Sequence, residues 1–174
     1  MDELYEQRRK WFEGYVQRIE HGVSKPPQPN TRYACPCCGY PTLFQRGSYE
    51  VCELCDWEDD GQDDPHANEV WGGPNGSYSL AAARQNFKLY YIMYDPHEFT
   101  NHIGGSGNSA IEDQAKRTIA ETFDVMVDET DQSVINTLWQ RIFDAEKILK
   151  NEKLRRVREY EAQAKGRSSP SGAG

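Results

Sequence analysis

Apolar residues recur with helical spacing in several separate stretches of the chain. In the first stretch, residues 2–20, an apolar side chain returns every three or four positions, at Phe12, Tyr15, Val16 and Ile19. This spacing places the four side chains on one face of a helix, where they can pack against a core. The sequence therefore predicts an amphipathic helix near the start of the chain.

Three more helical patterns follow in the second half of the chain. Residues 80–94 carry an apolar face behind a serine that can cap the first turn. Residues 110–122 follow the capping box that begins at Ser109, and residues 123–127 extend this helix or form a short strand. The longest pattern covers residues 133–162 with heptad-like spacing. We therefore expect about four helices.

Between the first and second helical patterns, the chain contains two Cys-x-x-Cys pairs. They are Cys35 with Cys38, and Cys52 with Cys55. The segment that joins them has the composition of a β-hairpin, with strands at 42–45 and 48–51 and a turn near Arg46 and Gly47. Such a hairpin carries one cysteine pair at each end and brings the two pairs together.

Four thiolates in two closely spaced pairs are the typical ligand set of a tetrahedral zinc site. Each short loop supplies two ligands at a low cost in chain entropy, and Gly39 lets the first loop turn behind Cys38. Iron in the same geometry and disulfide bonds are the alternatives. The fifth cysteine, Cys37, has three interpretations: a ligand in place of Cys38, a nucleophile with a lowered pKa, or a small packed side chain.

The segment after the second cysteine pair is acidic and rich in turn-forming residues. It partly imitates a calcium-binding loop, but Ala67 stands where that pattern needs a glutamate. The alternatives are a catalytic divalent-metal or acid–base site, a structured turn, and a contact surface for a basic partner. On the last interpretation, the partner-binding residues are Trp57, Glu58, Asp59, Asp60, Asp63, Asp64, His66 and Trp71.

Charge and composition narrow the function classes. The chain has 174 residues, a formal net charge of −8 and a hydrophobic fraction of 37%. An acidic surface repels phosphate backbones, so the charge disfavours general nucleic-acid binding and favours basic partners. The sequence shows no secretion signal and no apolar run long enough for a membrane span, so we expect a cytoplasmic protein with reduced thiols.

Residues 33–87 resemble the bacterial cysteine-rich CPCC family. The matching stretches are YACPCCGY, TLFQRGSYEVCELCDWEDDGQDDPHANEV and GGPNGSYSLAAARQNF. The resemblance implies a zinc-ribbon-like module in which the acidic loop and the following helix form one unit. The helices at 2–20 and 109–162 lie outside it, where they can adapt the module to a particular partner.

These patterns together predict an α+β fold, in which a zinc-ribbon-like β-hairpin module is flanked by about four helices. The expected divisions are an N-terminal helix at 1–25, the module with its following helix at 26–95, a helical region at 96–163 and a disordered tail at 164–174.

The expected function is non-enzymatic, because zinc ribbons hold shape and present surfaces more often than they catalyse. We expect a zinc protein that binds a protein partner, most concretely an immunity protein that neutralises a nuclease toxin. The alternatives are a metal-dependent hydrolase that uses the loop at 59–66, and a zinc-ribbon adaptor of the transcription or translation machinery.

Overall fold

The structure is a computed structural model that describes residues 3–20, 32–98 and 107–167. The end of the predicted N-terminal segment, at 21–25, and the tail from 168 onward lie outside the described residues. The side chains of Val16 and Ile19 do so as well. The prediction that the disordered tail begins at 164 is wrong for 164–167, which are helical.

Four helices occur in the described residues, close to the predicted ranges. They are α1 (Glu3–Glu20), α2 (Leu80–Tyr90), α3 (Ala110–Met126) and α4 (Gln132–Arg167). The capping box of α3 is present, because Ser109 and Glu112 each accept a backbone N–H of the other. Helix α2 ends earlier than expected, since Tyr91 adopts a left-handed conformation that a helix cannot continue through. Residues 123–126 extend α3 rather than forming a strand.

The short elements are two strands and two single-turn helices. They are β1 (Tyr33–Ala34), β2 (Pro41–Leu43), η1 (Asp64–His66) and η2 (Gly73–Asn75). Strands β1 and β2 pair antiparallel, with Tyr33 opposite Leu43. A two-stranded hairpin is thus present beside the cysteines, as the predicted α+β class requires.

The position of that hairpin differs from the prediction. The two halves of the segment between the cysteine pairs do not pair with each other as strands. Its first part pairs with the chain before Cys35, and Val51 near its end forms a bridge with Glu58, beyond the second pair. Each cysteine pair is therefore enclosed by its own short antiparallel ladder. The reason is that a Cys-x-x-Cys turn reverses the chain by itself, so the strands on either side of it become neighbours.

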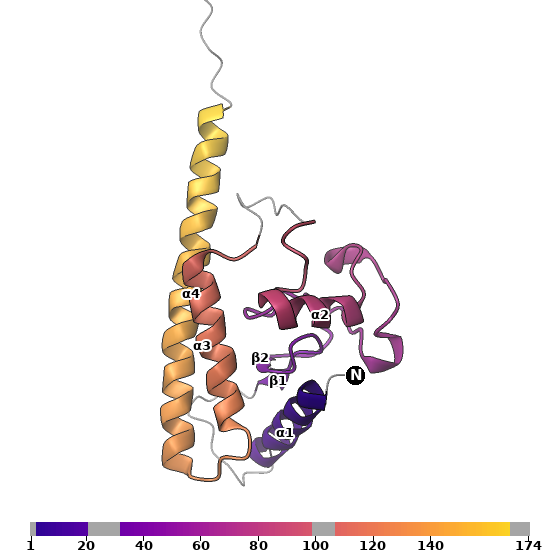
Figure 1. The fold of residues 1–174 in the computed structure, drawn as a ribbon, viewed down its shortest axis with the longest axis vertical. Coiled ribbons are helices and arrows are strands. Elements are labelled where there is room, and N and C mark those ends of the chain that lie inside the picture. The colour runs from indigo at the N-terminus through magenta and orange to yellow at the C-terminus, as the bar shows by residue number, and fades with distance from the viewer. Residues whose placement is uncertain (1–2, 21–31, 99–106, 168–174) are drawn as a thin grey trace, which may run out of the picture.

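Helices α3 and α4 form an antiparallel pair on one side of the molecule, and the cysteine module with α1 and α2 lies on the other (Figure 1). The core between them is rich in aromatic rings. Phe123 of α3 makes edge contacts with Phe12 of α1 and Trp139 of α4, and it stacks on Tyr40 of the module. The helices outside the module are thus packed directly against it.

Within the described residues, no helix is both long and apolar enough to cross a bilayer.

Candidate metal centre

The two Cys-x-x-Cys turns have the same backbone design. In the first turn, the amide of Gly39 donates to the carbonyl of Cys35 at 2.9 Å, and Gly39 has a φ of +78°. In the second, the amide of Asp56 donates to the carbonyl of Cys52 at 2.8 Å, and Asp56 has a φ of +64°. The residue after each second cysteine therefore turns left-handed, so that each loop directs its two sulfur atoms inward.

These turns bring the four predicted ligands together. The sulfur atoms of Cys35, Cys38, Cys52 and Cys55 all lie within 4.8 Å of one another, and all four residues are buried. The Sγ–Sγ distance is 3.7 Å between Cys35 and Cys55 and 3.8 Å between Cys38 and Cys52. Metal–sulfur bonds of about 2.3 Å in a tetrahedron place neighbouring sulfurs about 3.8 Å apart. The group therefore has the size of a tetrahedral metal site.

The same distances exclude disulfide bonds in this structure, since bonded sulfurs are about 2.05 Å apart and all five cysteines are free. Burial raises the pKa of Cys35, Cys38 and Cys55 well above the ordinary value for a thiol. For Cys52, burial also acts to raise the pKa, but hydrogen bonds with the other three thiols and Thr42 lower it well below the ordinary value. Four bare thiolates together are unfavourable in this interior, and a bound cation would supply the charge that stabilises them.

Cys37 lies outside the ligand group. Its side chain is buried, and burial raises the pKa of its thiol. An activated nucleophile needs the opposite shift and access to a substrate. The interpretation of Cys37 as a small packed side chain therefore agrees best with its surroundings.

The four cysteines lie in a segment that matches a known protein family. Residues 33–102 match a family described as cysteine-rich CPCC. We call residues 33–98, the described part of this match, the CPCC module. The match reaches further along the chain than the resemblance at 33–87 predicted, and so includes all of α2. The comparisons with curated proteins and with solved structures find no match.

The second turn of the CPCC module is held by two lysines from outside the module. Lys116 of α3 donates to one carboxylate oxygen of Asp56 at 2.9 Å, and Lys153 of α4 donates to the other at 2.6 Å. Lys153 also donates to the carbonyl of Glu53, inside the turn. The Lys116 side chain is fully buried, so its charge depends on Asp56 for compensation. These contacts fix the metal centre against the helix pair.

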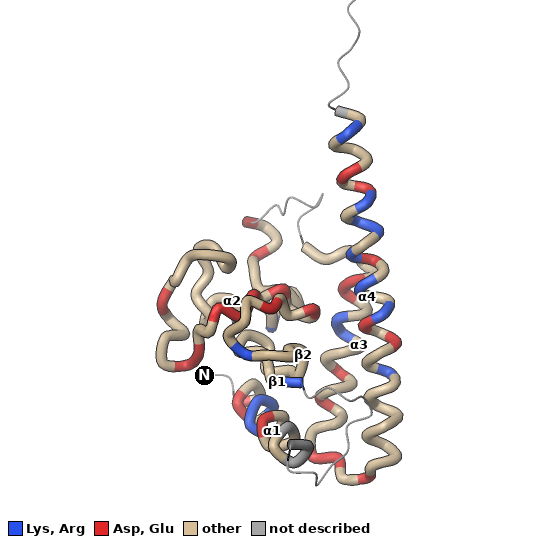
Figure 2. The backbone as a smooth tube through the Cα atoms, turned by 180° about the vertical axis from the view of Figure 1, so that it is seen from behind, with Lys and Arg blue, Asp and Glu red and all other residues tan. Residues whose placement is uncertain are grey.

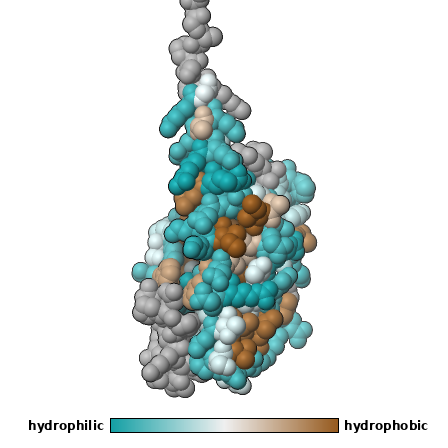
Figure 3. All heavy atoms as spheres, turned by 90° about the vertical axis from the view of Figure 1, so that its left-hand side faces the viewer, coloured by the Kyte–Doolittle hydropathy of each residue, from teal (hydrophilic) through white to brown (hydrophobic). Residues whose placement is uncertain are grey.

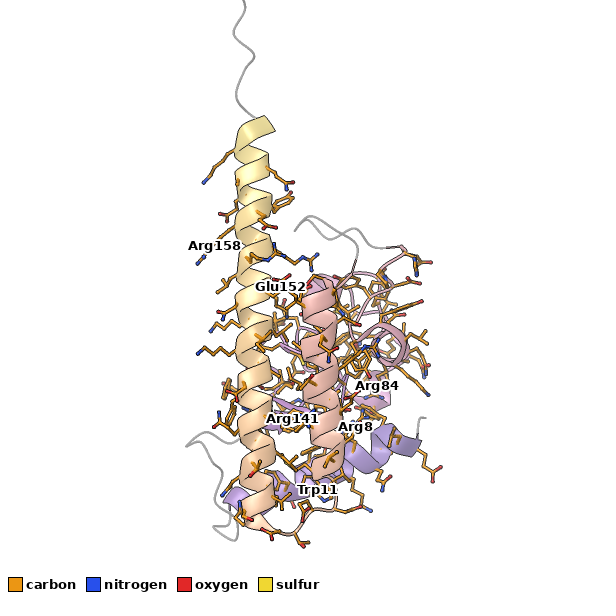
Figure 4. All side chains as sticks on the ribbon, turned by 60° about the vertical axis from the view of Figure 1, so that its left-hand side comes forward. Arg8, Trp11, Arg84, Arg141, Glu152 and Arg158 are labelled. Carbon is orange, nitrogen blue, oxygen red and sulfur yellow. The ribbon has the colours of Figure 1, made fainter. Side chains whose placement is uncertain are left out.

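The first turn is held from the other side of the module by α1 and α2. Tyr5 and Arg84 both donate to the carbonyl of Pro36, at 2.6 and 2.9 Å. Arg8 donates to the carbonyl of Cys38 and stacks its guanidinium on Tyr40, 4.0 Å from the ring centroid. A pocket of about 440 Å³ opens between Arg8 and Arg84, which Figure 4 shows near each other on α1 and α2.

The acidic loop is largely built into the module. Asp59 is completely buried, and its Oδ2 accepts from Nε of Arg46 at 2.9 Å and from the amide of Gly47 at 2.7 Å. Trp57 is also completely buried. The prediction that these two residues contact a partner is therefore wrong, because neither reaches the surface. Asp59 instead fixes the segment between the two cysteine pairs.

Asp63 and Asp64 are half-buried and paired with arginines. Asp63 forms ion pairs with Arg9 at 2.9 Å and with Arg46 at 3.1 Å. Asp64 forms ion pairs with Arg9 at 2.7 Å and with Arg84 at 2.6 Å. These pairs join the loop to α1 and α2. Of the four interpretations of this loop, the structured turn describes the geometry of these aspartates.

The beginning of the loop is held by Asn75, which sequence reasoning missed. Its side-chain amide accepts from the amide of Glu58 at 3.0 Å and donates to the carbonyl of Glu58 at 2.8 Å and to Asp60 at 3.3 Å. Buried Gln62 donates to the carbonyls of His66 and Glu69, both at 2.8 Å. Amides in a polar segment carry no sequence signal that distinguishes these internal clamps from solvated side chains.

Two of the predicted partner-binding residues are exposed. The side chain of His66 is exposed, and 46% of Trp71 is accessible. Their rings lie 5.7 Å apart, and Glu69 contacts both, accepting from Trp71 Nε1 at 3.0 Å. Among the described residues, the four cysteines are the only group of three or more potential ligands close enough to share a metal ion, so a second metal at this loop has no support.

Proposed function

We propose that the cysteine group binds zinc in a structural role. All four positions of the tetrahedron are filled by protein sulfurs, and all four are buried. A catalytic zinc keeps one position open for water or substrate, whereas a structural zinc is closed by four protein ligands. Soft thiolates also favour zinc or iron over hard cations such as Mg²⁺ and Ca²⁺.

We further propose that the CPCC module binds a protein partner. The observation that carries this proposal is the exposed tip, which we define as Glu69, Val70 and Trp71. Val70 and Trp71 expose large apolar side chains on a loop whose backbone is clamped by buried Gln62. A rigid, exposed tryptophan beside a carboxylate is the kind of residue that anchors interfaces. Because the loop is already ordered, binding costs little conformational entropy.

The most concrete partner is a nuclease toxin, which this protein would neutralise as a cytoplasmic immunity protein. A nuclease presents a basic face to nucleic acid, and the net charge of −8 complements such a face. The arginine-paired aspartates are not available for this role. Exposed carboxylates on the described part of the module are those of Glu53, Glu69 and Glu98.

The test is binding between this protein and a toxin domain encoded beside it. We expect a one-to-one complex, and we expect Trp71→Ala to weaken it by at least tenfold while the metal content stays unchanged. The control is Leu89→Ala, on the exposed surface of α2. A wild-type protein that does not bind, or a Trp71→Ala variant that binds equally well, contradicts the proposal. Co-purification with ribosomes or RNA polymerase instead favours the adaptor function.

We propose no catalytic role for the loop at 59–66. A hydrolytic site needs carboxylates that can bind a metal or activate water. Here Asp59, Asp63 and Asp64 are all neutralised by arginines. Hydrolysis of a substrate by purified protein, lost in Asp63→Asn, would restore the hydrolase alternative.

A further inference from the structure

The helix pair carries an apolar groove beside its core face, where Ala115 and Ala145 belong to both. The groove has a volume of about 430 Å³ and lies between α3 and α4. Buried Ala115 and Ala145 line it together with Ile111 and Ile148, whose side chains are 49% and 52% exposed. Figure 3 looks onto the α4 side of the molecule and shows apolar patches among hydrophilic residues there.

This groove differs from a scattering of single exposed residues, because two helices contribute to it with matching spacing. Ile111, Ala115 and Thr118 follow one another at four and three positions on α3. Arg141, Ala145 and Ile148 do the same on α4. Such stripes form the seam along which a further helix packs. The α3–α4 pair thus has one apolar face in the core and a second seam exposed to solvent.

The charges on the helix pair are sharply divided along its length. No lysine or arginine occurs from 118 to 140, around the turn between the helices. The carboxylates there are Glu121, Asp124, Asp128, Glu129 and Asp131. The last six or so turns of α4 carry three carboxylates, at Glu152, Glu159 and Glu161, but a larger number of basic residues. The basic residues are Lys147, Lys150, Lys153, Arg155, Arg156, Arg158, Lys165 and Arg167. Lys153, Arg155 and Arg156 already pair with carboxylates of the same chain, and the stretch as a whole stays net basic. Figure 2 shows red without blue at the turn, and blue interspersed with red along the far half of α4.

The basic half of α4 also extends well past the start of α3 (Figure 1). Leu154, level with the start of α3, and Tyr160, beyond it, are exposed at 45% and 40%. A single helix of this length gains little stability from its own backbone hydrogen bonds, so most helices of this kind are covered by a partner.

We propose that two copies of this chain associate through the α3–α4 groove, with their α4 helices antiparallel. Ile111 and Ile148 of each copy then cover the groove of the other, which gives a four-helix arrangement around a two-fold axis. In the antiparallel orientation, the basic half of each α4 runs toward the acidic turn of the other copy. A parallel orientation would instead place like charges together. Arg141 and Asp144, both on the groove, also have opposite charges that a two-fold axis can pair.

The experiment is a measurement of molar mass in solution by sedimentation or light scattering on the metal-loaded full chain. The chain has a mass of 20.0 kDa, so the dimer is twice that mass. We expect Ile148→Glu to raise the dimer dissociation constant at least tenfold. It places a carboxylate in an apolar seam next to Asp144. We expect Leu89→Glu, on α2 outside the groove, to leave the mass unchanged.

A charge exchange tests the orientation of the two copies. Arg141→Asp should weaken the dimer, because it places like charges opposite each other across the two-fold axis. The double variant Arg141→Asp with Asp144→Arg should restore the dimer, because the exchanged charges can pair again across that axis. We also expect dissociation to increase with salt concentration. A chain that stays monomeric at all concentrations overturns the proposal. A dimer that Ile148→Glu leaves intact also overturns it. The metal content of each variant serves as the control that the variant is folded.

Discussion

Gly39 and Asp56 occupy the same position in the two cysteine turns, and both adopt a left-handed backbone. Glycine adopts this conformation without strain, whereas aspartate does so at a small cost. The Asp56 carboxylate offsets that cost, because it accepts hydrogen bonds from both Lys116 and Lys153. Gly39 therefore serves only the backbone conformation of its turn. Asp56 serves the backbone in the same way and also joins the CPCC module to the helix pair.

Replacing Asp56 by glycine should separate these two roles. Glycine suits the backbone, but the charge of Lys116 is left buried without a partner, so we expect the free energy of unfolding to fall by about 3 kcal/mol or more. The double variant Asp56→Gly with Lys116→Met should recover part of this loss, because it removes the uncompensated charge. Denaturant unfolding of the metal-loaded protein measures both effects.

The matched control is Arg117→Ala. Arg117 is the neighbour of Lys116 on α3, and its ion pair with Asp113 is exposed, so its loss should cost less than about 1 kcal/mol. An Asp56→Gly variant as stable as the wild type would show that the lysine contacts do not stabilise the fold.

Metal content gives the second prediction. We expect purified protein to contain one zinc ion per chain, and Cys52→Ser to lose the zinc together with cooperative unfolding, because metal binding supplies folding free energy here. Cys37→Ser should retain both, since its sulfur is outside the tetrahedral group. Elemental analysis distinguishes zinc from iron. Protein that contains neither metal would contradict the assignment.

Asp59 gives the third prediction. Asp59→Ala removes one of the two carboxylate partners of Arg46 and leaves the amide of Gly47 without its acceptor, inside a buried site. We expect a loss of about 3 kcal/mol in unfolding free energy. Glu53→Ala, at an exposed position in the second turn, should change it by less than about 0.5 kcal/mol. Equal stabilities of the two variants would refute the structural role of Asp59.

Glu152 gives a prediction about pH. Hydrogen bonds from Arg155 and Ser109 lower the pKa of this carboxyl to about 2. A lowered folded-state pKa contributes stability above the unfolded value of about 4.3, and that stability is lost as pH falls toward 2. We therefore expect the stability difference between wild type and Glu152→Gln to be largest near neutral pH and to shrink between pH 4 and 2. A difference independent of pH would contradict this assignment.

Sequence patterns were sufficient to predict the parts of the fold that depend on near neighbours. The ligand pairs, the left-handed glycine behind Cys38 and the capping box at Ser109 each involve residues only a few positions apart. Local geometry gives such groups few alternatives, so their spacing was enough to predict them. The strand positions were the exception, because the reversal occurs at each cysteine turn rather than between the pairs.

Which polar residues are internal could be seen only in the folded chain. Nothing in the spacing of Asp59 distinguishes it from the exposed carboxylates, and the position of Lys116 on a helix does not reveal a partner at Asp56. These pairs depend on which distant elements meet, and a charge that is inexpensive in water becomes structural only when its counter-charge is buried with it. The same reason separates Trp57, buried in the module, from Trp71, which remains on the surface as the proposed partner anchor.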